Sequence, residues 1–192
     1  MFYALTASGK VGTIGKRLSL LTEFVPGLSR VGVMFNPDDE QDSPVPAELP
    51  SAAAQLKVQL RTYLVRNNEE IEKALAAREG NDDTGFYISG SPLLNINRAV
   101  VAERMLAMKR PAIGGVREQA VAGLLATYGA SVTDNYRKAA NYVVKIIRGT
   151  RPSDLPIEQA VKFDLIINLK TAKALGLAAP STLLAGADEM IE

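Results

Sequence analysis

The sequence predicts an α/β fold built on a doubly wound parallel sheet. From Gly15 onward, strand-like runs of about five residues alternate with amphipathic helical stretches, and this alternation is typical of βαβ crossovers. The chain of 192 residues is 47% hydrophobic and 22% charged, which is enough to bury a core in one large domain or in two small lobes. Neither an internal repeat nor a low-complexity tract interrupts the alternation.

The first helix and the first strand follow each other closely. Apolar residues over 18–25 recur at helical spacing, and Gly27 ends that helix. The run RVGVMF over 30–35 is mostly apolar and predicts a buried strand. Asn36 and Pro37 then end the strand.

The alternation continues to the end of the chain. An acidic, proline-bearing loop over 38–46 leads into a helix through Ala54 and Leu56, and 58–65 predicts the next strand. Asn68 is placed to cap a helix that begins at Glu69, because early carboxylates favour the positive end of a helix. Residues 80–83 end that helix, and the remaining strands, helices and linker are predicted at 85–89, 97–109, 111–113, 124–128, 133–148, 149–156 and 163–168.

The composition excludes several classes of function. Twenty-two basic and twenty-one acidic residues leave a formal charge of +1 without a basic stripe, so we expect no nucleic-acid partner. No apolar run approaches the roughly 20 residues of a membrane span. Residues 1–6 lack the charged and apolar regions of a signal peptide, so the chain would be cytoplasmic if it is complete. Without cysteine or histidine, we expect no enzyme activity, no cofactor and no metal.

Two segments resemble ligand-binding motifs but do not have the residue spacing that those motifs require. Gly9, Gly12 and Gly15 precede Lys16, but they match neither phosphate-binding glycine pattern. The acidic cluster over 38–42 lacks the alternating spacing and the distal glutamate of a calcium-binding EF-hand loop. The sequence therefore indicates neither a nucleotide site nor a calcium site.

Several segments carry a family resemblance. The C-terminal runs DLPIEQ at 154–159, FDLIIN at 163–168 and LKTAKALG at 169–176 resemble one group of ABC-transporter substrate-binding proteins, related to those that take up tryptophan and other small solutes. Further similar segments occur in the same order at 15–37, 110–129, 138–156 and 181–192.

The resemblance implies a type I periplasmic-binding-protein-like fold, with two doubly wound lobes and a small solute held in the cleft between them. It implies a permease partner and a periplasmic or extracellular location. This chain resembles one full lobe plus part of a second. We therefore expect four parts: a remnant or linker over 1–14, a solute-binding lobe over 15–115, a return segment of the other lobe over 116–156, and strand and helices returning over 157–192.

The return segment leads us to expect a homodimer. If residues 124–148 belong to a lobe whose opening strands are missing, an apolar helical face lacks a partner within the chain. That face consists of Ala139, Tyr142, Val143, Ile146 and Ile147. Exposed apolar faces of this kind usually become covered, and exchange between two copies is one route.

Candidate ligand-binding residues follow the predicted strands, because open α/β sheets bind ligands beyond the carboxyl ends of their strands. They are Asn36 and Asp39 after 30–35, Ser89 and Ser91 after 85–89, Gly115, Arg117 and Glu118 after 111–113, and Tyr128 and Ser131 at the end of 124–128.

The early loops allow two interpretations each. Ser89 and Ser91 could hydrogen bond to a carboxylate or an amino group, or could cap the next helix. Asn36 and Asp39 lie in a charge run that is more typical of a solvated surface.

The residues of the later loops also allow two interpretations each. Gly115 permits close backbone approach and Arg117 could clamp an anion, but an ion pair with Glu118 or another surface acid fits equally well. Ser131 either caps the following helix or caps it and meets an anionic group. Tyr128 either stacks on a solute ring or is a half-buried strand residue.

The preferred function is a solute-binding component of an ABC-type importer, which holds a small polar molecule such as an amino acid without chemistry. One alternative is a non-binding dimeric remnant of that family with a structural or regulatory role. The other is a cytoplasmic α/β enzyme that uses Asp39 or Glu118 with Lys16.

Overall fold

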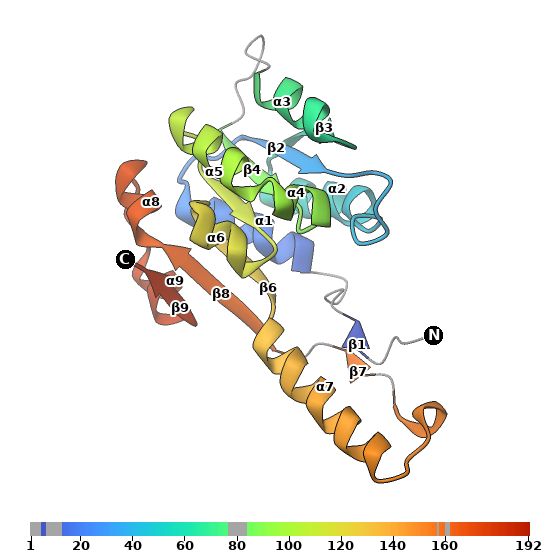
Figure 1. Cartoon of the computed structure of the whole chain (residues 1–192). Coiled ribbons are helices and arrows are strands. Elements are labelled where there is room, and N and C mark those ends of the chain that lie inside the picture. The colour runs from blue at the N-terminus through green and yellow to red at the C-terminus, as the bar shows by residue number, and fades with distance from the viewer. Residues whose placement is uncertain (1–4, 7–12, 77–83, 157, 160–161) are drawn as a thin grey trace.

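A computed structural model describes residues 5–6, 13–76, 84–156, 158–159 and 162–192 of the chain. Within these residues, one seven-stranded sheet runs in the order β3-β2-β4-β5-β6-β8-β9. Helices lie on both sides of this sheet (Figure 1). The predicted α/β class is thereby confirmed, with one strand pair, β6 and β8, antiparallel instead of parallel.

The strands of this sheet are β2 (Arg30–Phe35), β3 (Gln59–Leu64), β4 (Gly85–Ile88), β5 (Ala112–Gly114), β6 (Ala126–Ala130), β8 (Phe163–Asn168) and β9 (Glu189–Ile191). The helices are α1 (Thr13–Phe24), α2 (Val45–Leu56), α3 (Asn68–Ala76), α4 (Pro92–Ile96), α5 (Arg98–Ala107), α6 (Arg117–Ala122), α7 (Val132–Ile147), α8 (Leu169–Ala174) and α9 (Ser181–Ala185), with a 3-10 turn at Pro152–Asp154. A separate parallel pair joins β1 (Leu5–Thr6) to β7 (Glu158–Gln159).

The described core divides into two apolar clusters, one on each face of the sheet. Val31 and Val33 of β2 point to the cluster that α1 and α2 cover. Met34 points to the other cluster, which α3 and α5 cover. Successive strand side chains point to opposite faces, so a buried strand needs apolar residues on both sides. This is why β2 is a continuous apolar run.

The structure contains two short helices, α4 and α6, that were not predicted from the sequence. The predicted helix over 97–109 corresponds to α5, and the five-residue α4 precedes it and ends at Ile96. Helix α6 was not predicted, since its six residues are too few to show a clear periodicity. The predicted end of α3 at 80–83 lies outside the described residues.

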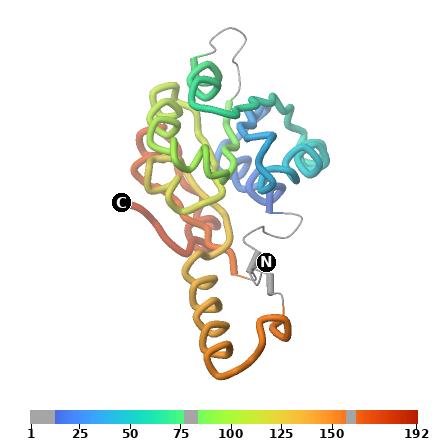
Figure 2. Tube along the Cα trace, turned by 45° about the vertical axis from the view of Figure 1, so that its right-hand side comes forward, coloured from blue at the N-terminus to red at the C-terminus, as the bar shows by residue number. Residues whose placement is uncertain are grey.

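The antiparallel pair β6 and β8 connects the body of the molecule to an arm. Strand β6 leads out of the sheet into α7, and β8 returns from the same direction, so the two strands must run in opposite directions. Figures 1 and 2 show α7 projecting away from the sheet, with the chain after it turning back alongside. We call α7 and the following residues to Pro156 the arm.

The first part of the predicted return segment lies in the body of the molecule. The predicted segment begins at 116, and Leu124 and Leu125 are fully buried in the body. Strand β6 pairs with β5 on one side and with β8 on the other. Residues 117–130, which include α6 and β6, therefore lie in the body, and the chain leaves the body only at α7.

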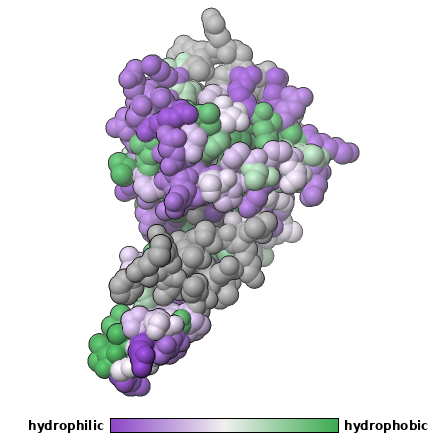
Figure 3. Space-filling view, turned by 90° about the vertical axis from the view of Figure 1, so that its right-hand side faces the viewer, coloured by the Kyte–Doolittle hydropathy of each residue, from purple (hydrophilic) through white to green (hydrophobic). Residues whose placement is uncertain are grey.

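One side of α7 packs against the returning chain and the other side is exposed. Tyr142 is buried, and its hydroxyl donates a hydrogen bond to the Pro156 carbonyl at 2.7 Å. By contrast, Tyr136 and Ile147 are 74% and 80% exposed. Figure 3 shows hydrophobic surface at the far end of the arm. The expected apolar face is thus partly covered within the chain and partly open.

Among the described helices, none combines the length and the apolar character that crossing a lipid bilayer would require.

Candidate functional site

Several elements meet at one end of the sheet and enclose a cavity. Strands β2, β4, β5 and β6 are parallel to one another, so their carboxyl ends reach the same edge. The cavity at this edge has a volume of about 150 Å³. Residues from α1, the loop before α2, the strand ends and α7 line it, among them Thr13, Arg17, Asp42, Tyr87, Gly115 and Asn135. We call this space the cleft cavity.

Arg17 supplies the positive charge of the cleft cavity. It lies in α1, and its Nε donates a hydrogen bond of 2.6 Å to the Tyr128 carbonyl. Its Nη1 donates to the Tyr87 hydroxyl at 3.0 Å, and its guanidinium carbon lies 5.9 Å from the centre of that ring. These contacts join α1 to β4 and β6. They fix the planar guanidinium at the cavity wall in one orientation.

Two glycines make room for the guanidinium. A Cβ atom at position 115 would lie 3.2 Å from Arg17 Cζ, closer than ordinary packing allows. A Cβ atom at position 129 would collide with the Gly115 carbonyl oxygen. Gly115 and Gly129 therefore allow the ends of β5 and β6 to approach each other beneath Arg17.

Tyr87 lies beside Arg17 and is 1% exposed. Burial raises the pKa of the Tyr87 hydroxyl, and the neighbouring Arg17 opposes that rise. The hydroxyl accordingly stays protonated at neutral pH and accepts the hydrogen bond from Arg17.

Asp42 supplies a buried carboxylate. It is 3% exposed, and its Oδ2 accepts hydrogen bonds from the Asn36 N–H at 2.9 Å and from Ser89 Oγ at 2.7 Å. Ser91 Oγ lies 3.1 Å from Ser89 Oγ and extends the network. Burial raises the pKa of the Asp42 carboxyl, whereas these hydrogen bonds act to lower it. The carboxylate also ties the loop before α2 to the end of β4.

Gln119 holds the two neighbouring loops together. Its side chain is fully buried, its Oε1 accepts a hydrogen bond from the Gly115 N–H at 2.9 Å, and its Nε2 donates to the Ser89 carbonyl at 2.7 Å. One amide thus satisfies a donor after β5 and an acceptor after β4. Because buried polar groups are costly when unpaired, this bridge fixes the shape of the cavity floor.

The structure brings some of the predicted residues to the cleft cavity. Ser89 and Ser91 are buried in the Asp42 network, and Gly115 lines the cavity. Asn36 contributes its backbone N–H, while its side chain accepts a bond from the Asp38 N–H. Tyr128 contributes its carbonyl, and its ring stacks on Phe163 with 5.8 Å between ring centres.

The other predicted residues have partners elsewhere. The Asp39 carboxylate accepts a hydrogen bond from the Gln41 N–H within its own loop. Arg117 forms a bidentate ion pair with Glu189, at 2.6 and 2.7 Å, instead of pairing with Glu118. Arg117 and Glu118 line a neighbouring cavity of about 290 Å³. Ser131 caps α7, with its Oγ accepting from the Asp134 N–H at 3.5 Å.

Sequence reasoning missed Arg17, Asp42, Tyr87 and Gln119. Asp42 appeared there only as the last residue of the acidic cluster over 38–42, which lacks the spacing of a calcium site. Arg17 lies three residues after Ile14 on the flank of the buried face of α1, where a charge reaches the rim of the core. The position of Arg17 on the helix could therefore have indicated, from the sequence, a charged residue at the edge of the core. The Asp42 network depends on contacts 47 residues apart in sequence, which local patterns do not reveal.

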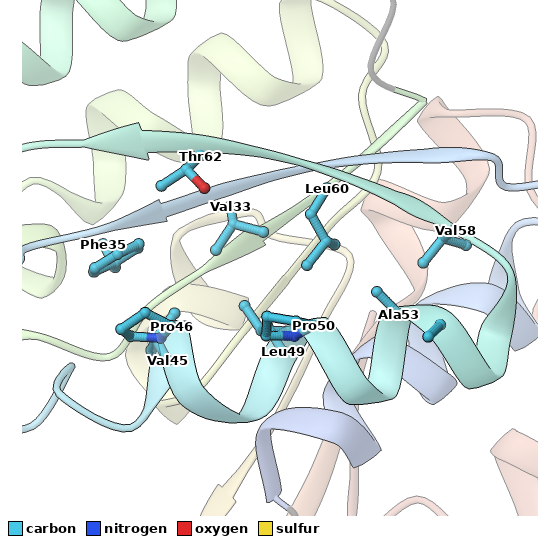
Figure 4. A pocket seen from close by; sticks show the side chains of 11 residues that line it. Val33, Phe35, Val45, Pro46, Leu49, Pro50, Ala53, Val58, Leu60 and Thr62 are labelled. Atoms are coloured by element: carbon cyan, nitrogen blue, oxygen red, sulfur yellow. The ribbon is translucent and has the colours of Figure 1, made fainter.

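A second cavity is larger but has the wrong chemistry for a polar ligand. It lies between α2 and strands β2 and β3, and its volume is about 450 Å³ (Figure 4). Its lining is aliphatic and aromatic, with Thr62 as the one hydroxyl-bearing residue among those that line it. The polar groups converge in the smaller cavity, so we take that one as the functional site.

In the part of the chain that the structure describes, no three histidine, cysteine, aspartate or glutamate side chains are grouped so as to hold a metal ion.

The chain matches known proteins over most of its length. Residues 7–191 match the family model described as ABC transporter substrate binding protein. A tyrosine-binding protein of Clostridioides difficile strain R20291 is 22% identical over 165 residues, which cover 86% of this chain and 48% of that protein. The chain therefore spans about half the length of this relative.

Two solved structures share the fold. A conserved domain protein from Vibrio cholerae O1 biovar El Tor strain N16961 superposes with a TM-score of 0.85 at 22% identity, covering 97% of this chain and 62% of that one. An ABC domain in complex with L-Trp from Streptococcus pneumonia superposes with a TM-score of 0.83 at 17% identity, covering 93% and 62%. At such identities, the likeness concerns the fold.

Proposed function

This chain belongs to the ABC transporter substrate binding protein family, and from that membership we propose that it binds a small polar solute, such as an amino acid, for an ABC-type importer. Binding proteins of this architecture act by closing a hinge over the ligand, without chemistry. The proposed activity is therefore reversible binding.

The cleft cavity is the observation that carries the proposal. Arg17, Asp42 and the Ser89 hydroxyl, which come from separate parts of the chain, converge where parallel strands end. A cavity lined by charged side chains at this edge of an open α/β sheet is the usual place for a small ligand.

Amino acids are the favoured class of solute for two reasons. The relatives include a protein named for tyrosine binding and a structure that contains L-Trp. The cleft cavity also offers a cationic group and an anionic group, as an amino acid requires. We extend the class, and not the particular amino acid, to this chain.

The partners and the location are part of the same proposal. We propose that a permease of the importer receives the solute, and that the protein works outside the cytoplasmic membrane. We also propose a homodimer in which the exposed side of α7, including Tyr136 and Ile147, packs against a second copy.

A non-binding dimeric remnant is the second candidate function. The exposed apolar side of α7 favours it, because a protein that serves only to assemble needs that surface and not the cleft. The two candidates differ in whether any solute binds.

Solute binding is tested with purified protein and a panel of the standard amino acids. A thermal-shift screen comes first, and isothermal titration calorimetry of each compound that raises the melting temperature comes second. We expect at least one amino acid to bind with a dissociation constant in the micromolar range or below. If every amino acid leaves the melting temperature unchanged and gives no heat of binding, the remnant replaces the importer component.

A further inference from the structure

We propose that the cleft cavity takes a zwitterion in one orientation, with the carboxylate of the ligand on Arg17 and its ammonium group on Asp42. This inference rests on the proposed function and goes further, because it assigns each end of the ligand to one side chain.

Arg17 has the geometry of a carboxylate receptor. Its contacts with Tyr128 and Tyr87 use Nε and Nη1 as donors to neutral oxygens. The guanidinium keeps further N–H groups for a ligand, and it matches a carboxylate in two-point fashion. Within the described residues, Arg17 takes part in none of the ion pairs, although the Glu48 carboxyl lines the same cavity.

Asp42 supplies a negative charge that also lacks an ion-pair partner among the described residues. Its carboxylate is almost fully buried, and its hydrogen bonds come from a neutral N–H and neutral hydroxyls. Across the part of the chain that the structure covers, it too forms no ion pair. A buried charge without a partner is unfavourable, so a cation that enters the cleft cavity would relieve it.

Arg17 and Asp42 form no ion pair with each other, and Tyr87 is a neighbour of both. Arg17 donates to the Tyr87 hydroxyl, and the negative charges of Asp42 and Glu48 both act on that hydroxyl. The lining of the cleft cavity thus contains the guanidinium of Arg17 and the carboxyl groups of Asp42 and Glu48. A ligand in the reverse orientation would place like charges together, which fixes the direction of binding.

Three ligands test the assignment: the tightest amino acid of the panel, the amine that lacks its carboxylate, and the α-hydroxy acid that lacks its ammonium group. For the unaltered protein, we expect the amine and the hydroxy acid to bind about 30-fold or more weakly than the amino acid. Calorimetry measures all three affinities.

Two substitutions should then each lower the affinity for a different pair of the three ligands. Asp42→Asn should weaken the amino acid and the amine by about 30-fold, and should leave the hydroxy acid within about threefold. Arg17→Gln should weaken the amino acid and the hydroxy acid, and should leave the amine within about threefold. Asp38→Asn, an exposed change in the same loop as Asp42, and Arg104→Gln, an exposed change in α5, are the matched controls and should alter none of the affinities.

The outcomes distinguish the proposed orientation of the ligand from the proposed binding of amino acids. If the amino acid binds but each substitution weakens all three ligands equally, the orientation is wrong while the proposed function stands. If none of the ligands binds the unaltered protein, both claims fail. Should Arg17→Gln not fold, Arg17→Lys keeps the charge and loses the planar fork. It should weaken the amino acid and the hydroxy acid but not the amine, and uniform weakening would again overturn the orientation.

Discussion

The buried Gln119 amide donates a hydrogen bond of 2.7 Å to the Ser89 carbonyl, and so joins the loops after β4 and β5. The same side chain accepts from the Gly115 N–H. Both loops line the cleft cavity, so this amide shapes the site without needing to contact a ligand.

Gln119→Leu should therefore destabilise the protein. The substitution leaves one buried N–H and one buried carbonyl without partners, at a cost of about 2 to 4 kcal/mol in the free energy of unfolding. Urea unfolding followed by circular dichroism measures the change. Gln55→Leu, at an exposed position of α2, is the control and should shift the free energy by less than about 0.5 kcal/mol. Equal stability of the two variants would contradict the bridging role.

Gly129→Ala should disturb the junction of β5 and β6. The added methyl group would collide with the Gly115 carbonyl, and backbone atoms cannot rotate away as a side chain can, so we expect a loss of about 2 kcal/mol or more. Gly186→Ala is the matched control, since a Cβ atom there would lie 3.5 Å from its nearest neighbour. Thermal unfolding of both variants tests this. A Gly129→Ala protein as stable as the control would rule out the close approach.

The raised pKa of Asp42 predicts opposite effects of pH on stability and on binding. Because the folded state binds the Asp42 proton more tightly than the unfolded state, this group favours folding more as the pH falls through its raised pKa. The stability of the unaltered protein should thus rise relative to Asp42→Asn as the pH falls toward 3.8, the ordinary value.

Binding should weaken over the same range of pH, because a protonated Asp42 no longer attracts an ammonium group. Calorimetric titrations at a series of pH values, for the unaltered protein and for Asp42→Asn, measure this. The variant should show little dependence on pH. An equal dependence in both proteins would show that another group titrates.

The exposed side of α7 predicts a dimer that a single charge can disrupt. Ile147→Glu should convert the dimer to monomer, because it places a carboxylate in the apolar contact. Size-exclusion chromatography with light scattering reports the mass. Val121→Glu, which alters an exposed apolar residue of α6, is the control and should remain dimeric. A monomeric unaltered protein would end the dimer proposal.

The fold was largely predictable because its local patterns agree with its tertiary contacts. The strand at 163–168 was predicted with the bounds that β8 has, and the apolar run at 30–35 coincides with β2. The direction of β8 was not predictable, because it follows from the path of the arm and not from any pattern within the strand.

The site was less predictable, because its key contacts are distant in sequence. The rule that ligands lie beyond strand ends led to Ser89, Ser91 and Gly115. It did not lead to Arg17, which lies on a helix and reaches a carbonyl 111 residues away. Charged side chains that enter a site from outside the strand loops need the tertiary structure to be recognised.

Native mass spectrometry of gently purified protein tests the central claim most directly, because it reports any retained small molecule on the intact chain. We predict a bound solute with the mass of an amino acid, which Asp42→Asn loses. A protein that carries nothing as purified, and still carries nothing after incubation with the full amino-acid panel, would contradict the account.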